Sequence, residues 1–252
     1  MTPDMLPSSP ETISGVLSAQ VAADPARPLI TWYDQADGAR IELSVVTTAN
    51  WTAKTAGLLR DVLDAGPGSR VSIDLPAHWQ SAVWVLATWA LGATVVPVGS
   101  PAIDVAVIGP SVLDGSVPDA AEVVATALHP LGAAFSDALP VGVTDFGAEV
   151  LAMPDGFVPR SPVPADAVAY DDPAGPVSQA GLLELGSARA TSLGLGEHGR
   201  LLSTTSASTL EGALTTVVAP LVVSGSLVLV SNPHPGATDD IAAQEQVDVR
   251  AV

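Results

Sequence analysis

Apolar residues alternate between helical spacing and short continuous runs along this chain. The first part predicts a helix over residues 10–23, a β-hairpin with strands at residues 29–33 and 40–43, and a long helix over residues 45–63. The two strands are joined through Ala-Asp-Gly, a sequence that is typical of a tight turn. The pattern therefore places an N-terminal β-hairpin between two helices.

The middle of the chain is more uniformly apolar. Strands are predicted at residues 70–75, 94–98 and 105–108, and helices at residues 78–91 and 119–128. Strands this apolar are typical of a parallel sheet that helices cover on both faces. We therefore predict an α/β fold with a doubly wound, mostly parallel sheet and right-handed crossovers.

The composition changes between residues 140 and 179, where prolines are frequent. We interpret this segment as a loop-rich linker with one short strand at residues 167–170. Residues 1–252 are expected to form one domain, in which the linker joins two α/β segments. Beyond the linker, the pattern predicts helices at residues 178–193, 209–223 and 236–246, and strands at residues 200–204, 226–230 and 247–252.

The chain is strongly acidic. Its 252 residues include 27 Asp or Glu and 9 Lys or Arg, so the net charge is −18 at pH 7. Nucleic-acid binding needs a basic surface, and anionic membranes attract basic segments, so this charge argues against both kinds of partner. Charged residues make up only 14% of the chain and hydrophobic residues 48%, which favours a packed core over a disordered acidic chain.

No segment is expected to enter a membrane. The most apolar stretch, residues 81–98, contains Thr, Gly and Pro and divides into a helix and a strand. Residues 1–10 have no basic region and include Asp4, unlike a secretory signal. We therefore expect a cytoplasmic location.

Several patterns that often carry chemistry are absent or out of place. The chain has no cysteine, which excludes disulfides, thiol catalysis and cysteine metal sites. Residues 194–199 match the glycine pattern of dinucleotide-binding loops, but they follow a helix and precede a strand, so we interpret them as a helix-ending turn. The four histidines share no metal-ligand spacing, and no serine stands in a nucleophile-elbow motif. We predict neither a catalytic residue nor a metal site.

The only lysine lies on one predicted helix, and three of the tryptophans lie on another. Lys54 is in the middle of its helix, so a phosphate-binding loop of the Walker type is absent. We expect Lys54 to be a surface charge that pairs with a nearby acidic residue. Trp79, Trp84 and Trp89 follow one another at spacings of five on another helix and are expected to pack in the core.

One junction between a strand and a helix suits an anion. Ser203, Thr204, Thr205 and Ser206 follow a predicted strand and precede a predicted helix. Hydroxyls and free backbone amides at such a junction can hold a phosphate or a carboxylate. The same residues can also do no more than cap the helix. Both interpretations stay open, and these four residues are the candidate binding site.

Two parts of the chain carry features that occur together in one known family. The first comprises the hairpin and helix at residues 28–59, the Gly-Pro-Gly-Ser-Arg-Val-Ser-Ile-Asp-Leu-Pro motif at residues 66–76, and the apolar residues 87–98. The second comprises residues 193–203 and 219–230. In this order and spacing they resemble the N-terminal region of adenylate-forming enzymes, which include acyl-CoA synthetases, luciferases and nonribosomal adenylation domains. We identify the chain as a short actinobacterial homologue of that region.

The resemblance implies the fold of that family and also marks what this chain lacks. The family binds the phosphates of ATP with a loop rich in Ser, Thr and Gly that ends in lysine, after a strand that corresponds to residues 167–170. Here Asp171 and Asp172 follow that strand, and two carboxylates repel a triphosphate. The nucleoside-binding motifs and the catalytic lysine of the family would lie beyond Val252. No cofactor is therefore predicted, and ATP or AMP binding is not expected.

These observations lead to three hypotheses about function. The first is a non-catalytic homologue of adenylate-forming enzymes that acts by binding or through a protein partner. The second is a subunit of a split acyl-activating ligase that another chain completes. The third is a small-molecule binder that keeps an acyl or nucleotide pocket near Ser203–Ser206.

Overall fold

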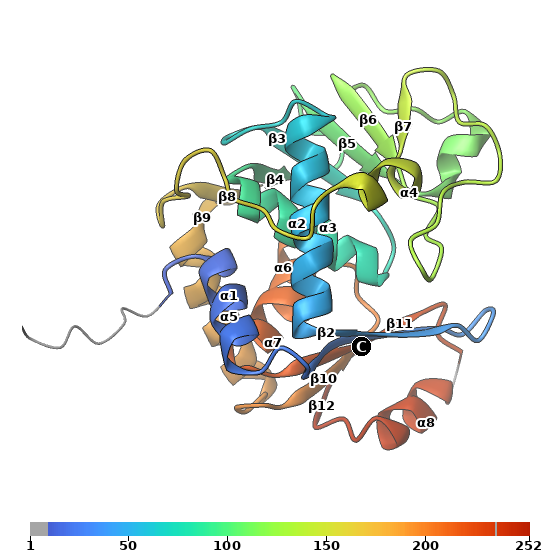
Figure 1. The fold of residues 1–252 in the computed structure, drawn as a ribbon. Helices are drawn as coiled ribbons and strands as arrows, with labels where there is room; N and C mark the ends of the chain where they lie inside the picture. The colour runs from blue at the N-terminus through green and yellow to red at the C-terminus, as the bar shows by residue number, and fades with distance from the viewer. Residues whose placement is uncertain (1–9, 235) are drawn as a thin grey trace, which may run out of the picture.

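Two mostly parallel β-sheets form the centre of the molecule (Figure 1), which the computed structural model describes over residues 10–234 and 236–252. The larger sheet has the strand order β7 (Val143–Asp145), β6 (Glu122–Ala125), β5 (Val105–Ile108), β3 (Arg70–Asp74), β4 (Thr94–Val96), β8 (Val168–Asp172) and β9 (Gly175–Ser178). The smaller has the order β12 (Val249–Ala251), β10 (Arg200–Ser203), β11 (Ser226–Ser231), β1 (Pro28–Asp34) and β2 (Arg40–Ser44). Within the described residues, the antiparallel pairs are the hairpins β1–β2 and β8–β9.

The predicted α/β class, the mostly parallel strands and the N-terminal hairpin are confirmed. The strands are divided between two sheets, because the hairpin does not pair with the strands that follow it in the chain. Instead β1 pairs in parallel with β11, in a register that places Thr31 opposite Val228. The two ends of the chain therefore build the smaller sheet together.

Helices cover the sheets and lie close to their predicted positions. The longer ones are α1 (Ile13–Ala23), α2 (Val45–Asp61), α3 (Trp79–Leu91), α5 (Gln179–Leu193) and α8 (Ala237–Gln244). Ser44 and Ser178 begin α2 and α5, and each accepts the amide of the residue three positions on. The short helical segments are α4 (Phe146–Glu149), α6 (Leu210–Ala213), α7 (Ala219–Val222), the 3₁₀ turns Pro110–Asp114 and Val150–Ala152, and the π-helical turn Leu214–Val218.

Helix α3 lies between the two sheets and is almost wholly buried. It packs against β3 and β4 of the larger sheet, against β1 of the smaller sheet, and against α1 and α2. Trp79 donates to the Pro130 carbonyl at 3.1 Å, Trp89 donates to the Ala169 carbonyl at 2.9 Å, and Trp84 is fully enclosed. The prediction that these tryptophans pack in the core is confirmed. No helix in the described ranges is both long and apolar enough to cross a membrane.

The helix predicted at residues 119–128 is wrong. This segment contains strand β6, which pairs in parallel with β5 along one edge and with β7 along the other. Its alanines and glutamate suit a helix, but Val123 and Val124 are buried in the sheet. Tertiary pairing and burial of these β-branched side chains outweigh the local helical preference.

The proline-rich segment contains more regular structure than predicted. It holds β7, α4, β8 and β9. Its interpretation as a linker between two α/β segments stays a prediction. Residues 153–163, here termed the strap, contain no helix or strand and run across α2 before reaching β8 (Figure 1). The strap is attached to α2 through Lys54, which binds the Asp155 carboxylate at 3.1 Å. The expectation that Lys54 pairs with an acidic residue is confirmed, although its side chain is mostly buried.

Helix α5 touches the π-helical turn through a glycine. A Cβ atom built on Gly186 would lie 2.3 Å from Cγ1 of Val218, a distance that real Cβ atoms do not reach. Gly186 therefore allows the two backbones to approach closely beneath the smaller sheet.

Replacing Gly186 with Ala is expected to destabilise the protein by about 1–2 kcal/mol, because the overpacking cost exceeds the gain in helix propensity. Urea unfolding followed by circular dichroism measures this change. Ser187→Ala, at an exposed position on the same helix, is the control and should change the free energy of unfolding by less than about 0.5 kcal/mol. An unchanged or higher stability of Gly186→Ala would contradict this packing.

Candidate functional site

The carboxyl ends of the parallel strands converge where the two sheets meet, which is where open α/β folds bind ligands. A cavity of about 300 Å³ lies there, at the ends of β1, β10 and β11 and at the start of α3. Its polar lining residues are Asp34, His78, Thr204, Ser231 and Asn232. The volume is at the lower end of small-molecule sites in proteins.

Histidine 78 begins helix α3 and lines this cavity. Its Nδ1 atom accepts a hydrogen bond from the Gln80 amide at 3.1 Å, and its ring packs edge-on against Trp32 at 4.3 Å between centroids. The residue is 2% exposed, and this burial lowers the pKa of the imidazole to about 3. The Leu128 backbone and the Asp34 carboxylate act in the opposite direction and offset only part of the effect. His78 is therefore a neutral ring at physiological pH.

The second ring nitrogen of His78, Nε2, makes no hydrogen bond to the described residues. Because Nδ1 accepts a hydrogen bond, the neutral ring carries its proton on Nε2. The Leu128 backbone lies close enough to influence the ring, but its geometry falls short of a hydrogen bond, so Nε2 has no partner among the described residues. The signal in the sequence was the position of His78, directly before an apolar helix, where capping side chains occur.

The four residues of the candidate anion site separate in space. Ser203 is buried, and its hydroxyl donates to the Ala251 carbonyl at 2.7 Å and accepts the Thr205 amide at 3.1 Å. Thr204 lines the cavity at His78, and Thr205 is exposed on the surface. Ser206 turns away to donate to a backbone carbonyl. Anion binding here stays a prediction, with two of the four hydroxyls engaged inside the protein.

The serines after β10 join the two sheets. Ser206 and Ser208 both donate to the Leu75 carbonyl at the end of β3, at 2.6 and 2.9 Å. The Tyr170 hydroxyl, from β8, donates to the Ser208 carbonyl at 3.3 Å. The two contacts to Leu75 connect residues more than a hundred positions apart, so no spacing in the sequence indicates them. The loop after β10 is fixed by the larger sheet and is not free to close on a ligand.

The turn between β8 and β9 stands where the resemblance places a phosphate-binding loop. The turn is tight, with Asp172 opposite Gly175 in the hairpin. Asp172 accepts the Ala174 amide at 2.9 Å, and Asp171 binds Arg70 at 2.8 Å. The turn is closed by its own side chains, and it presents carboxylates rather than free amides and a lysine.

A second arginine, besides Arg70, lies near this turn. Arg189 lines an open hollow of about 480 Å³ together with Asp172 and Glu211. Its guanidinium donates to the Thr215 hydroxyl at 2.9 Å and lies 3.5 Å from the Glu211 carboxylate. Two carboxylates therefore accompany the single cation, and the hollow does not favour an anion.

The remaining motifs have structural roles. Gly194 ends α5 with φ at 72°, a conformation that glycine adopts easily, so the interpretation of residues 194–199 as a helix-ending turn is confirmed. Lys54 is in the middle of α2. Among the described residues, no group of three His, Asp or Glu side chains is placed to hold a metal ion.

Comparison with known proteins identifies a relative that matches this chain over nearly the whole length of both sequences. No family model matches the sequence. A protein of Mycobacterium tuberculosis, described as a TIGR03089 family protein, is 42% identical over 248 residues, which cover 95% of this chain and 98% of that protein. This chain belongs to the TIGR03089 family.

Solved structures of acyl-CoA synthetases share the fold of this TIGR03089 family member. The Brucella canis acyl-CoA synthetase matches with a TM-score of 0.76 and 17% identity, over 95% of this chain and 46% of the enzyme. The acetoacetyl-CoA synthetase from Streptomyces lividans gives 0.73 and 20%, over 94% and 41%. The Mycobacterium tuberculosis fatty acyl CoA synthetase gives 0.67 and 16%, over 94% and 48%. The resemblance to adenylate-forming enzymes is confirmed for the fold, and the chain spans less than half the length of each enzyme.

Replacing His78 with Asn should flatten the pH dependence of stability. The pKa of His78 is about 3 in the folded state against 6.5 for an ordinary histidine, so below pH 6.5 the unfolded chain binds a proton that the folded protein does not. The parent should therefore lose stability more steeply, by about 1 kcal/mol per pH unit, between about pH 6 and pH 4. Asn keeps an acceptor for the Gln80 amide but does not titrate.

Urea unfolding at several pH values measures the difference between the two slopes. His198→Asn, at an exposed position, is the control and should keep the slope of the parent. Equal slopes for the parent and His78→Asn would show that His78 is not held neutral by burial.

Proposed function

We propose that this TIGR03089 family member is a non-catalytic relative of acyl-CoA synthetases that acts in the cytoplasm by binding a small molecule or a protein partner. The closed β8–β9 turn is the observation that carries the proposal. Enzymes that transfer phosphoryl or adenylyl groups depend mainly on cations and amides that stabilise the phosphates. At this turn Arg70 is neutralised by Asp171, and the Asp172 carboxylate faces the hollow beside it.

The absence of a nucleotide cofactor belongs to the same proposal. A triphosphate placed at the β8–β9 turn would approach two carboxylates and a backbone that is already hydrogen-bonded. The only lysine of the chain, Lys54, lies on α2, where it binds the strap. ATP or AMP binding therefore has no support at this position.

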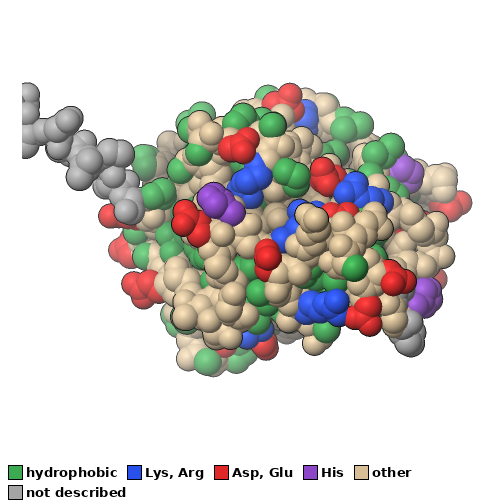
Figure 2. Space-filling model, turned by 90° about the horizontal axis from the view of Figure 1, so that it is seen from below, with side chains coloured by type: hydrophobic (Ala, Val, Ile, Leu, Met, Phe, Trp, Pro, Cys, Tyr) green, Lys and Arg blue, Asp and Glu red, His purple; other side chains and the backbone are tan. Residues whose placement is uncertain are grey.

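The charge distribution supports a partner other than nucleic acid or membrane. On the face shown in Figure 2, Lys and Arg side chains lie beside Asp and Glu side chains and form no continuous basic area. Arg40 and Arg200 both bind Glu245, and Arg250 binds Asp239. Such pairing leaves no basic stripe in these regions, and counterion release by a polyanion needs one.

A split ligase is the second candidate function. It is favoured by one observation, namely that the chain spans less than half the length of the acyl-CoA synthetases whose fold it shares. In that case a second polypeptide would supply the missing cationic groups. Affinity purification of this chain from the native host tests this alternative. Recovery of the chain as a monomer without a partner would exclude it.

The purified chain is expected to give no ATP–pyrophosphate exchange with short-, medium- or long-chain carboxylic acids. An acyl-CoA synthetase assayed in parallel is the positive control for the reagents. The reason is electrostatic, since the phosphate-binding position lacks a free cation. Exchange above the level without protein would contradict the proposal if Asp171→Lys or Asp172→Lys alters it, because the activity would then belong to this site.

A further inference from the structure

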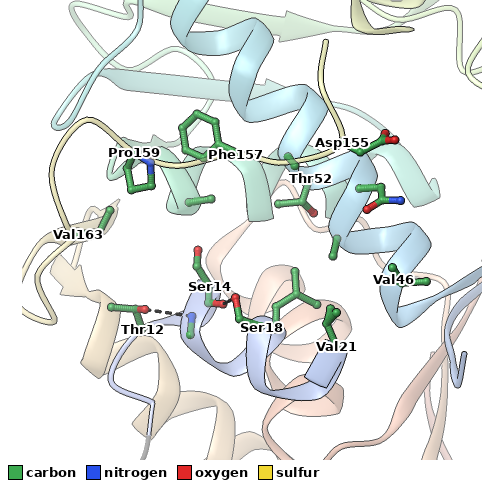
Figure 3. A pocket seen from close by; sticks show the side chains of 16 residues that line it. Thr12, Ser14, Ser18, Val21, Val46, Thr52, Asp155, Phe157, Pro159 and Val163 are labelled. Carbon is green, nitrogen blue, oxygen red and sulfur yellow. Dashed lines mark hydrogen bonds between the residues drawn. The ribbon is translucent and has the colours of Figure 1, made fainter. Parts of the chain in front are cut away.

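A second cavity lies between helices α1 and α2 beneath the strap (Figure 3). Its volume is about 510 Å³, within the range of small-molecule sites in proteins. It shares no lining residue with the cavity at His78 or with the β8–β9 turn. The two cavities are therefore separate sites.

The strap is held over this cavity by the two basic residues of α2. Lys54 binds the Asp155 carboxylate at 3.1 Å and donates to the Met153 carbonyl. Arg60 lies over the ring of Phe157, 4.9 Å from its centroid. These contacts hold the strap in place through the protein's own side chains, so a ligand would not have to order this part of the wall.

The wall of the cavity is mostly apolar. Asp155 is its only charged residue in the described part of the chain, and Lys54 neutralises it. An anionic ligand would also approach a chain whose net charge is −18, so the site favours a neutral one. The larger apolar side chains come from α1, α2 and the strap, namely Leu17, Val21, Val46, Phe157 and Val163, and Ala90 of α3 also lines the cavity.

One buried hydroxyl in the wall has no hydrogen-bond partner. Thr52 is 6% exposed, and its Oγ1 atom is unpaired among the described residues. Thr48, one turn earlier, instead donates to the Ser44 carbonyl at 2.9 Å, as helical threonines commonly do. Figure 3 shows Thr52 projecting from α2 toward α1, while Ser14 rises from α1 on the opposite side. This Oγ1 atom has less than 1 Å² of accessible surface, so a ligand in the cavity would meet the carbon atoms of Thr52 and not its oxygen.

We propose that this cavity binds a small neutral molecule that is mostly apolar. The apolar part of the wall takes up the body of the ligand. This inference goes beyond the proposed function, because it stands whether or not the chain activates a carboxylic acid.

Fluorescence titration with 1-N-phenylnaphthylamine, a neutral apolar dye, tests the cavity. We expect saturable binding of one dye per chain, displaced by octan-1-ol at least about ten-fold better than by octanoate. Ala49→Phe fills the cavity from α2 and should weaken dye binding more than about ten-fold. Ala19→Phe makes the same change at an exposed position of α1 outside the cavity and should leave dye binding unchanged. Ser18→Phe fills the cavity from α1 and serves if Ala49→Phe fails to fold.

Two valine variants test whether the Thr52 hydroxyl takes part in binding. Thr52→Val should leave the binding of both dye and octan-1-ol unchanged, because the substitution keeps the shape of the wall and the Thr52 oxygen does not meet the cavity. Thr55→Val removes another unpaired buried hydroxyl of α2 that does not line the cavity, and should alter neither.

Absence of saturable dye binding, or binding that Ala49→Phe and Ser18→Phe leave intact, would overturn the proposed site. Octanoate binding as tightly as octan-1-ol would overturn its assigned chemistry. Neither result bears on pyrophosphate exchange, so failure of this inference is distinguishable from failure of the proposed function.

Discussion

A helix enclosed between two sheets is the constraint on which the rest of this structure depends. Because α3 packs against both sheets, it fixes the distance between them and the place where their strands end. The Trp79 and Trp89 indoles, hydrogen-bonded to the carbonyls of Pro130 and of Ala169 in β8, fix its rotation. His78 at its start is consequently buried and neutral at the edge of the cavity where the strands of the smaller sheet converge. The geometry of the candidate site therefore follows from the burial of one helix.

The polar groups near this site mostly serve the joint between the sheets. Ser206 and Ser208 bind the end of β3, and Asp171 binds Arg70, so side chains that resemble a binding loop in the sequence are already occupied. We propose on this basis that this TIGR03089 family member keeps the fold of acyl-CoA synthetases without their activity. It shares a fold with acyl-CoA synthetases, while the position that the resemblance assigns to phosphate binding carries carboxylates in a closed turn. Two cavities lie away from this turn, one at the neutral His78 ring and one with a mostly apolar wall under the strap.

The sequence predicted local structure well and long-range arrangement less well. Periodicity located α2 and α3 because the apolar residues within each segment are sufficient to indicate a helix. It misassigned residues 119–128, since pairing with β5 is a tertiary effect, and it did not predict that β1 joins β11 to make a second sheet. For the site, only Thr204 of the four candidate residues reaches the cavity, because hydroxyl partners such as Ala251 and Leu75 lie far away in the sequence.

We propose that the β8–β9 turn, where the resemblance places phosphate binding, has no affinity for a nucleoside triphosphate. Isothermal titration of the purified chain with Mg²⁺ and ATP measures that affinity directly. The account predicts no saturable binding up to a concentration of about 5 mM, well above the dissociation constants at which a functional site would saturate. Saturable binding with a dissociation constant below about 1 mM, weakened when Arg70 or Arg189 is replaced by Ala, would contradict it.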